Sequence, residues 1–156
     1  MSTIHEFRIE DHRLTAVSLN PDAQGVPIIL LHGITASVYF WSPDLVASFV
    51  GRGPCYALSL PGHYPATFPH PYREAALTDE SIARVLTTAI RELVADQPVM
   101  LVGHSTGGFA ALAIAAYTPE IAHSVLSISG FAHGPWTGEL GKYQDWVRDG
   151  SLGRLK

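Results

Sequence analysis

Hydrophobic and polar positions follow two different rhythms along the chain, and the rhythm changes a little before Val26. The first two apolar segments, Ile4–Ile9 and Leu14–Leu19, are short and alternate roughly with polar residues. A polar stretch, 10–12, separates them, so the pair predicts an antiparallel β-hairpin. A turn is expected directly afterwards, where Asn20, Pro21 and Asp22 interrupt the pattern.

From Val26 onward, continuous apolar runs alternate with segments of helical periodicity. Uninterrupted apolar runs are typical of strands that are buried on both faces. Helical segments are indicated by apolar positions at i, i+3, i+4 and i+7 and by capping residues at their starts. The predicted elements are strand Val26–His32, a helix that begins at Ser42-Pro43-Asp44, strand Pro54–Leu60, helix Asp79–Val94 after a Thr78 cap, strand Pro98–Gly103, helix Ser105–Tyr117 and strand Ser124–Ser129.

Strands that alternate with helices predict an α/β fold with a mostly parallel sheet and helices on both faces. The chain has 156 residues, which fits one ordinary domain, and 47% of them are apolar, which supplies a sizeable core. Beyond Trp136 the pattern gives only one short amphipathic piece, Leu140–Val147.

The charge and cysteine content restrict the partners and the cellular compartment that are expected. The net charge is −4 and no Lys/Arg cluster is present, which argues against nucleic acid or an anionic membrane surface as a partner. No apolar run reaches the roughly 18 residues of a membrane-spanning helix, and Met1–Glu10 lacks the regions of a secretory signal. Cys55, the only cysteine, lies in an apolar run and is expected to be a buried structural thiol. We therefore expect a cytoplasmic protein without an internal disulfide.

The segment that carries chemistry is Gly103-His104-Ser105-Thr106-Gly107, a G-x-S-x-G pattern between an apolar strand and an apolar helix. In that context the serine lies on a strained strand-to-helix turn, and small neighbours let the backbone pass close by. Its hydroxyl would then project above the sheet at the positive end of the helix, where a developing oxyanion is stabilised. Ser105 is therefore the predicted nucleophile.

With these residues, the chain up to about Gly130 resembles the α/β-hydrolase fold family. His32-Gly33-Ile34, directly after a predicted strand, resembles the family's oxyanion segment. The resemblance implies that the backbone N–H groups of Ile34 and Thr106 form the oxyanion hole, and Trp41 matches an aromatic position near the start of the next helix. Residues 1–135 would form the core, and residues 136–156 the start of a lid or cap.

Leu60-Pro61-Gly62-His63 resembles the family's D-x-P-G-x-G segment but departs from it twice. Ser59 stands where Asp is usual, and Tyr64 where Gly is usual. The fold assignment does not depend on these two positions, although the loop need not behave as in other members.

Other residues near these motifs have structural interpretations beside the functional ones. His104 and His32 are expected to pack or hydrogen-bond locally, and His63 and His70 can be solvated loop residues. The aromatic residues 39–41 either line an acyl pocket or belong to the core.

A serine needs a base to accept its proton and a carboxylate to orient that base. The resemblance implies the order Ser, then Asp or Glu, then His, and the later strands that would carry them are not found in this sequence. His133 and Glu139 are the local candidates, in inverted order. We therefore expect this chain to be a fragment that is inactive by itself, with the acid and base outside this sequence, on a complementing C-terminal segment or chain. The strand Ser124–Ser129 would then be an exposed apolar edge that makes the chain prone to associate.

These features predict a serine hydrolase that acts on a carboxylic ester or a related acyl or carbon–carbon bond of a small molecule. A perhydrolase activity would use the same residues. No metal or organic cofactor is implied, since acyl transfer by this route needs none. A non-catalytic ligand-binding or scaffold protein that keeps the serine turn as architecture is the alternative.

Overall fold

A computed structural model describes residues 3–68 and 78–132 of the chain. The predicted lid segment 136–156 lies outside these residues, as do His70, His133 and Glu139. The elements in chain order are β1 (Ile4–Ile9), β2 (His12–Ser18), β3 (Ile28–Leu31), η1 (Val38–Phe40), α1 (Pro43–Val50), β4 (Cys55–Leu58), α2 (Asp79–Val94), β5 (Val99–His104), α3 (Thr106–Tyr117), η3 (Pro119–Ile121) and β6 (Ala122–Ile128).

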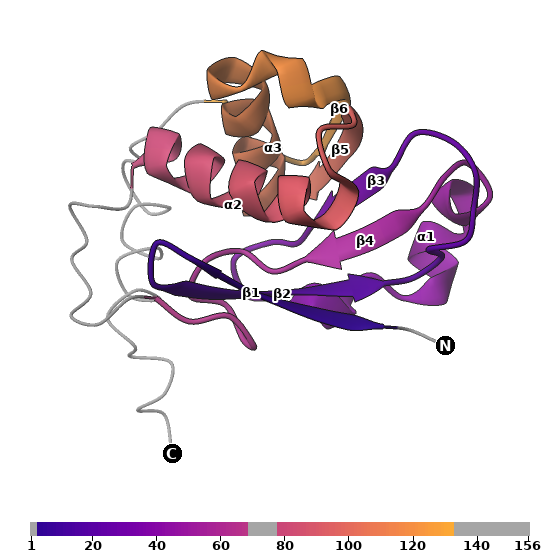
Figure 1. Cartoon of the computed structure of the whole chain (residues 1–156), viewed down its shortest axis with the longest axis horizontal. Helices are drawn as coiled ribbons and strands as arrows, with labels where there is room; N and C mark the ends of the chain where they lie inside the picture. The colour runs from indigo at the N-terminus through magenta and orange to yellow at the C-terminus, as the bar shows by residue number, and fades with distance from the viewer. Residues whose placement is uncertain (1–2, 69–77, 133–156) are drawn as a thin grey trace.

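The six strands form one mixed sheet in the order β1-β2-β4-β3-β5-β6 (Figure 1). Strands β3, β4, β5 and β6 are parallel, whereas β2 is antiparallel to both β1 and β4. The predicted hairpin and mostly parallel sheet are both confirmed, and the structure adds that β2 joins the hairpin to the parallel strands. The predicted strand Ile4–Ile9 has the observed bounds. The ends of the other five predicted strands differ from the observed ones by one or two residues, because hydrogen-bonded pairing, and not hydrophobicity, sets where a strand ends.

Helices cover both faces of the sheet, as the fold class predicts. Side chains alternate across β3: Ile29 and Leu31 belong to the apolar cluster that includes α2 and α3, while Ile28 and Leu30 belong to the cluster that includes α1. All four are at most 1% exposed. Because both faces are covered, the sequence of this strand is continuously apolar. Figure 1 shows α2 and α3 next to each other and α1 apart from them.

Helix α2 begins and packs as its sequence predicts. The Thr78 hydroxyl accepts from the Ser81 N–H at 3.1 Å, and the Ser81 hydroxyl accepts from the Thr78 N–H at 2.9 Å, which is a reciprocal capping box. Its predicted apolar face lies in the core, with Leu86 and Ile90 fully buried. The helix thus covers part of one face of the sheet.

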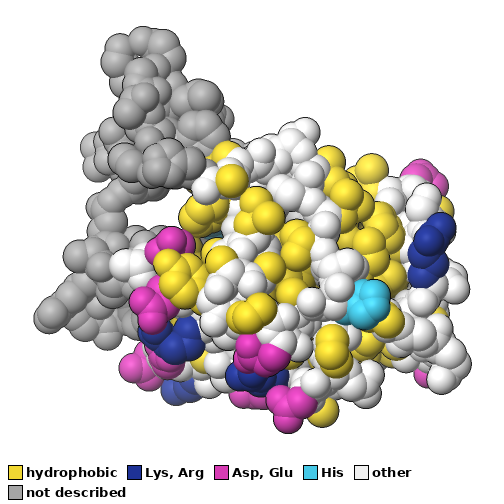
Figure 2. All heavy atoms as spheres, turned by 90° about the horizontal axis from the view of Figure 1, so that it is seen from above, with side chains coloured by type: hydrophobic (Ala, Val, Ile, Leu, Met, Phe, Trp, Pro, Cys, Tyr) yellow, Lys and Arg dark blue, Asp and Glu magenta, His cyan; other side chains and the backbone are white. Residues whose placement is uncertain are grey.

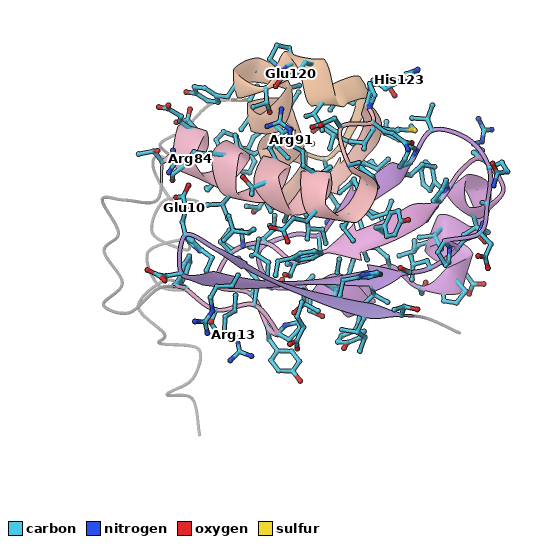
Figure 3. The ribbon with its side chains drawn as sticks, viewed as in Figure 1. Glu10, Arg13, Arg84, Arg91, Glu120 and His123 are labelled. Carbon is cyan, nitrogen blue, oxygen red and sulfur yellow. The ribbon has the colours of Figure 1, made fainter. Side chains whose placement is uncertain are left out.

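Two ion pairs fasten α2 to its neighbours, as Figure 3 shows. Arg84 pairs with Glu10 of the β1–β2 turn at 2.7 Å, and Arg91 pairs with Glu120 of η3 at 2.8 Å. The Arg84 guanidinium lowers the pKa of the Glu10 carboxyl. All four side chains are largely exposed, so each pair contributes at most about 1 kcal/mol.

Strand β6 forms the outer edge of the sheet, and no strand of the described residues pairs with its outer side. Of the three apolar residues predicted on this edge, Leu126 and Ile128 are 39% and 37% exposed. Val125 differs, since it packs against the core cluster beneath α3. Figure 2, which looks down on the part of the molecule at the top of Figure 1, shows hydrophobic side chains across much of that face.

We predict that Leu126→Lys lowers self-association of this chain. A charge on an exposed edge strand opposes pairing with a second sheet and removes little from the core. The dissociation constant from sedimentation velocity should rise by about tenfold or more. Ile4→Lys, at a 57% exposed position on the opposite edge strand, is the matched control and should change it little. Equal association of Leu126→Lys and the unmodified chain would contradict the prediction.

Candidate active site

The candidate site lies where the strand order reverses. From β3 the chain moves to β4 on one side and then to β5 on the other, so the carboxyl ends of β3 and β5 flank a topological switch point. Such points form crevices in which open α/β sheets bind ligands. Leu31 pairs with Gly103, which brings the segments that follow β3 and β5 next to each other.

Ser105 lies at the bend between β5 and α3. Its φ of 54° and ψ of −117° fall outside the helical region, in a conformation that costs a non-glycine residue on the order of 1–3 kcal/mol. The Ser105 N–H donates to Ile128 O at 2.9 Å, and its carbonyl accepts from the N–H groups of Gly108 and Phe109 at 2.9 and 3.2 Å. The structure therefore has the sharp strand-to-helix bend that the G-x-S-x-G pattern predicts, and Ser105 precedes the helix instead of beginning it.

The glycines of the motif are required by backbone contact. A β-carbon on Gly103 would lie 2.1 Å from Gly107 O, and one on Gly107 would lie 2.2 Å from Leu31 O. Both obstacles are main-chain oxygens, which cannot rotate away as the end of a side chain could. Small residues at 103 and 107 are thus what allows α3 to start directly above β3 and β5.

The predicted oxyanion segment lies beside Ser105. A β-carbon on Gly33 would lie 3.4 Å from the Ser105 β-carbon and 3.6 Å from His104 O, so the two segments lie close together. Ile34 follows Gly33, and Thr106 is the first residue of α3. Neither the Ile34 nor the Thr106 N–H donates to an acceptor in the described residues, so both are available donors on the two segments that meet at the bend.

His32, directly after β3, holds neighbouring backbone segments together beside the site. It is fully buried, and its Nε2 accepts from the Leu60 N–H at 3.1 Å. The Nδ1–H therefore donates to Gly33 O at 2.8 Å, which fixes the neutral tautomer. Burial lowers the pKa of His32 to about 4. The sequence predicts the structural role, but not the Leu60 partner, which lies two residues beyond the end of β4.

The structure shows the surroundings of the two residues that depart from the family pattern, Ser59 and Tyr64, and of His63 beside them. Ser59 is fully buried, and its hydroxyl accepts from the Thr15 N–H at 2.9 Å, which extends the contact of β2 with β4. Tyr64 is 78% exposed. His63, expected to be solvated, is partly buried: its Nδ1 lies 3.0 Å from Pro61 O, and its ring lies edge-on to His32.

The three aromatic residues after the oxyanion segment have different surroundings. Trp41 is 6% exposed and belongs to the core cluster of α1, as the core interpretation predicts. Phe40 stacks on the His104 ring with centroids 5.2 Å apart. Tyr39 is 59% exposed. The core interpretation therefore applies to Trp41, and the acyl-pocket interpretation stays a prediction for the other two residues.

Within residues 3–68 and 78–132, no histidine forms a hydrogen bond with Ser105. The same residues contain no cluster of three or more His, Cys, Asp or Glu that could hold a metal ion. No described helix is long and apolar enough to cross a membrane.

Cys55 is fully buried, and burial raises the pKa of its thiol, in agreement with a structural role.

The sheet is open and mostly parallel, with helices on both faces, and a serine lies at a strained strand-to-helix turn. These features are typical of α/β hydrolases. The chain is a member of the alpha/beta hydrolase fold family, whose sequence model matches residues 26–154.

Among curated proteins, the chain is 31% identical over 105 residues to a pimeloyl-[acyl-carrier protein] methyl ester esterase from Neisseria meningitidis. That alignment covers 67% of this chain and 36% of the relative, so the chain spans about a third of the length of the curated relatives it matches.

Solved structures show the same fold. The Cif epoxide hydrolase from Acinetobacter nosocomialis superimposes with a TM-score of 0.74 at 19% identity, over 97% of this chain and 48% of that one. The thioesterase domain from the curacin biosynthetic pathway gives a TM-score of 0.70 at 20% identity, over 96% and 54% of the two chains.

We predict that His32 makes stability depend on pH. Its pKa of about 4 in the folded state lies below the ordinary 6.5, so the unfolded chain binds more protons between these values. The stabilisation is complete above pH 6.5 and is lost as the pH falls toward 4, by up to about 3 kcal/mol. Urea unfolding at several pH values measures this loss. His32→Gln, which keeps a donor and an acceptor, should be less stable at pH 7.5 and lose less stability across this window. An equal slope in both proteins would contradict the assignment.

We also predict that Gly107→Ala destabilises the fold by at least about 2 kcal/mol, because its β-carbon would meet the backbone at Leu31. Gly51→Ala is the matched control, since a β-carbon there meets nothing within 4 Å and the residue already has a right-handed conformation. Thermal and urea unfolding of both variants should separate them clearly. Similar midpoints would show that α3 can move away from β3 without cost.

Proposed function

We propose that this chain is the nucleophile-bearing part of a serine hydrolase that cleaves carboxylic esters or related acyl bonds. The observation that supports this most directly is the strained bend at Ser105 beside Gly33, at the switch point of the sheet. Family membership supports hydrolysis in general. The matches to methyl ester esterases favour an ester over other acyl or carbon–carbon bonds.

In the proposed reaction, the Ser105 oxygen forms a bond to the carbonyl carbon of the ester. The carbonyl π electrons move to the oxygen, and the serine proton passes to a base. Collapse of this intermediate breaks the bond to the alcohol oxygen, which leaves with that proton. Water then attacks the acyl-serine in the same way and releases the acid, so the net change is hydrolysis without a cofactor.

The oxyanion would be held by the backbone N–H groups of Ile34 and Thr106. Both lack an acceptor in the described residues, and both belong to segments that lie close together at the bend. The N-terminus of α3 adds the positive end of a helix dipole at the same place. Donors that are fixed before the reaction lower the barrier without reorganisation, and loss of one typically costs about 100- to 1000-fold in rate.

The base and the acid would come from residues other than 3–68 and 78–132. Within this range His32 uses both ring nitrogens for the backbone, and His104 directly precedes the nucleophile. We propose a histidine and a carboxylate on a segment that completes the sheet beyond β6. His133 with Glu139 is the less favoured source.

A non-catalytic ligand-binding protein is the second candidate. It is favoured by one observation, that no described histidine reaches Ser105. In that case the bend at Ser105 would have a structural role only. The two candidates differ in whether the Ser105 hydroxyl reacts with an acylating or phosphonylating reagent.

We predict that a fluorophosphonate probe labels Ser105, because such probes report activated serine hydroxyls and generate a charged oxygen in the oxyanion hole. Labelling should be strongest in the polypeptide encoded by the complete reading frame, wherever that frame ends. Mass spectrometry of the modified peptide identifies the site. Ser105→Ala should abolish labelling, and Ser48→Ala, which removes an exposed hydroxyl, should not. Absence of labelling in every form would favour the ligand-binding protein.

A further inference from the structure

The segment that carries Ile34 has few polar contacts of its own. It runs from Gly33 to Phe40 and is called here the 33–40 loop. Its internal backbone hydrogen bonds are Ala36 N–H to Gly33 O at 3.1 Å and Phe40 N–H to Ser37 O at 3.0 Å. At its ends, Gly33 O also accepts from His32 Nδ1–H at 2.8 Å, and Phe40 O accepts from the Ser42 N–H at 2.9 Å. None of these bonds connects the loop to the bend at Ser105, so its position relative to the serine depends on other contacts.

His104, which directly precedes Ser105, contacts both ends of this loop. At the start, a β-carbon on Gly33 would lie 3.2 Å from His104 Nδ1, so the ring lies close enough to the Gly33 backbone that a side chain there would be crowded. At the end, Phe40 stacks on the imidazole with centroids 5.2 Å apart and planes 22° apart. One side chain thus spans the loop from its first residue to its last.

The Phe40 end of this contact is itself anchored. Phe40 meets the Trp41 ring edge-on, with centroids 5.1 Å apart and planes at 81°. Trp41 is 6% exposed and packs in the α1 core cluster, which also contains Val46 and Val102. The stack therefore connects the residue before the nucleophile to the hydrophobic core, and not to a mobile surface side chain.

Ring contacts hold the imidazole. His104 Nδ1 is buried and has no hydrogen-bond partner in the described residues, and no other hydrogen bond of this side chain is present there. The contact of His104 with the 33–40 loop therefore depends on its flat ring. A hydrogen-bonding role would instead require a partner for the buried nitrogen.

We propose that His104 is a positioning residue that holds the 33–40 loop, and with it the Ile34 N–H, against the bend at Ser105. Its contribution to catalysis rests on the function proposed above, whereas its effect on the loop does not. A displacement of about 1 Å of a donor can cost roughly 100-fold in rate, so a ring that fixes the loop at both ends determines whether the oxyanion donor is in place.

Two measurements test this separately. Amide hydrogen exchange of peptides that cover residues 33–40 reports the loop directly, and the rate constant of fluorophosphonate labelling reports the site. His104→Ala should raise exchange in the loop and lower the labelling rate, each by about tenfold or more. His104→Phe, which keeps a flat ring, should restore both to within about threefold. The matched control is His123→Ala, which removes an exposed histidine from β6 (labelled in Figure 3) and should change neither.

Unchanged loop exchange in a folded His104→Ala protein would overturn the proposal, and so would equal loosening in His104→Phe. If His104→Ala does not fold, Phe40→Leu removes the other ring of the stack at similar volume, and it must loosen the same peptides or the proposal fails. If the unmodified protein is never labelled while loop exchange responds as expected, the hydrolase function fails and the positioning role stands.

Discussion

The backbone contact between the start of α3 and the ends of β3 and β5 is the constraint on which the rest of the site depends. At Gly103 and Gly107 the chains approach so closely that no β-carbon fits between them. This approach forces the reversal at Ser105, and the reversal places one serine above the sheet edge with the helix N-terminus behind it. The cost of the strained conformation is offset by the helix and by the hydrogen bonds at either side of the bend.

Around that bend, two histidines hold neighbouring segments by different means. His32 is neutral and buried, and it uses both ring nitrogens to join the end of β3 to Leu60 beyond β4. His104 uses its ring, which stacks on Phe40 and lies with its Nδ1 close to Gly33. A site that depends on fixed main-chain donors needs such supports, because a backbone N–H moves with the whole segment that carries it.

Much of the fold could be predicted from the sequence because the signals are local. Continuous apolar runs indicated β3 and β5, and helical periodicity with a Thr78 cap indicated α2. The predicted bend at Ser105 followed from the glycines beside it. Strand ends were less accurate, and the packing of Val125 against the core could not be predicted, since the same apolar character suits an exposed edge and a covered one.

By itself, the sequence determined the order and kind of the elements and the residue at the sharp bend, because periodicity, caps and glycines act within a few positions. Only the tertiary structure decided that β2 pairs with β4, that His32 accepts from Leu60 and that Phe40 stacks on His104. These contacts join residues far apart in the chain. They depend on the order in which strands assemble around a shared core, and no local pattern specifies that order.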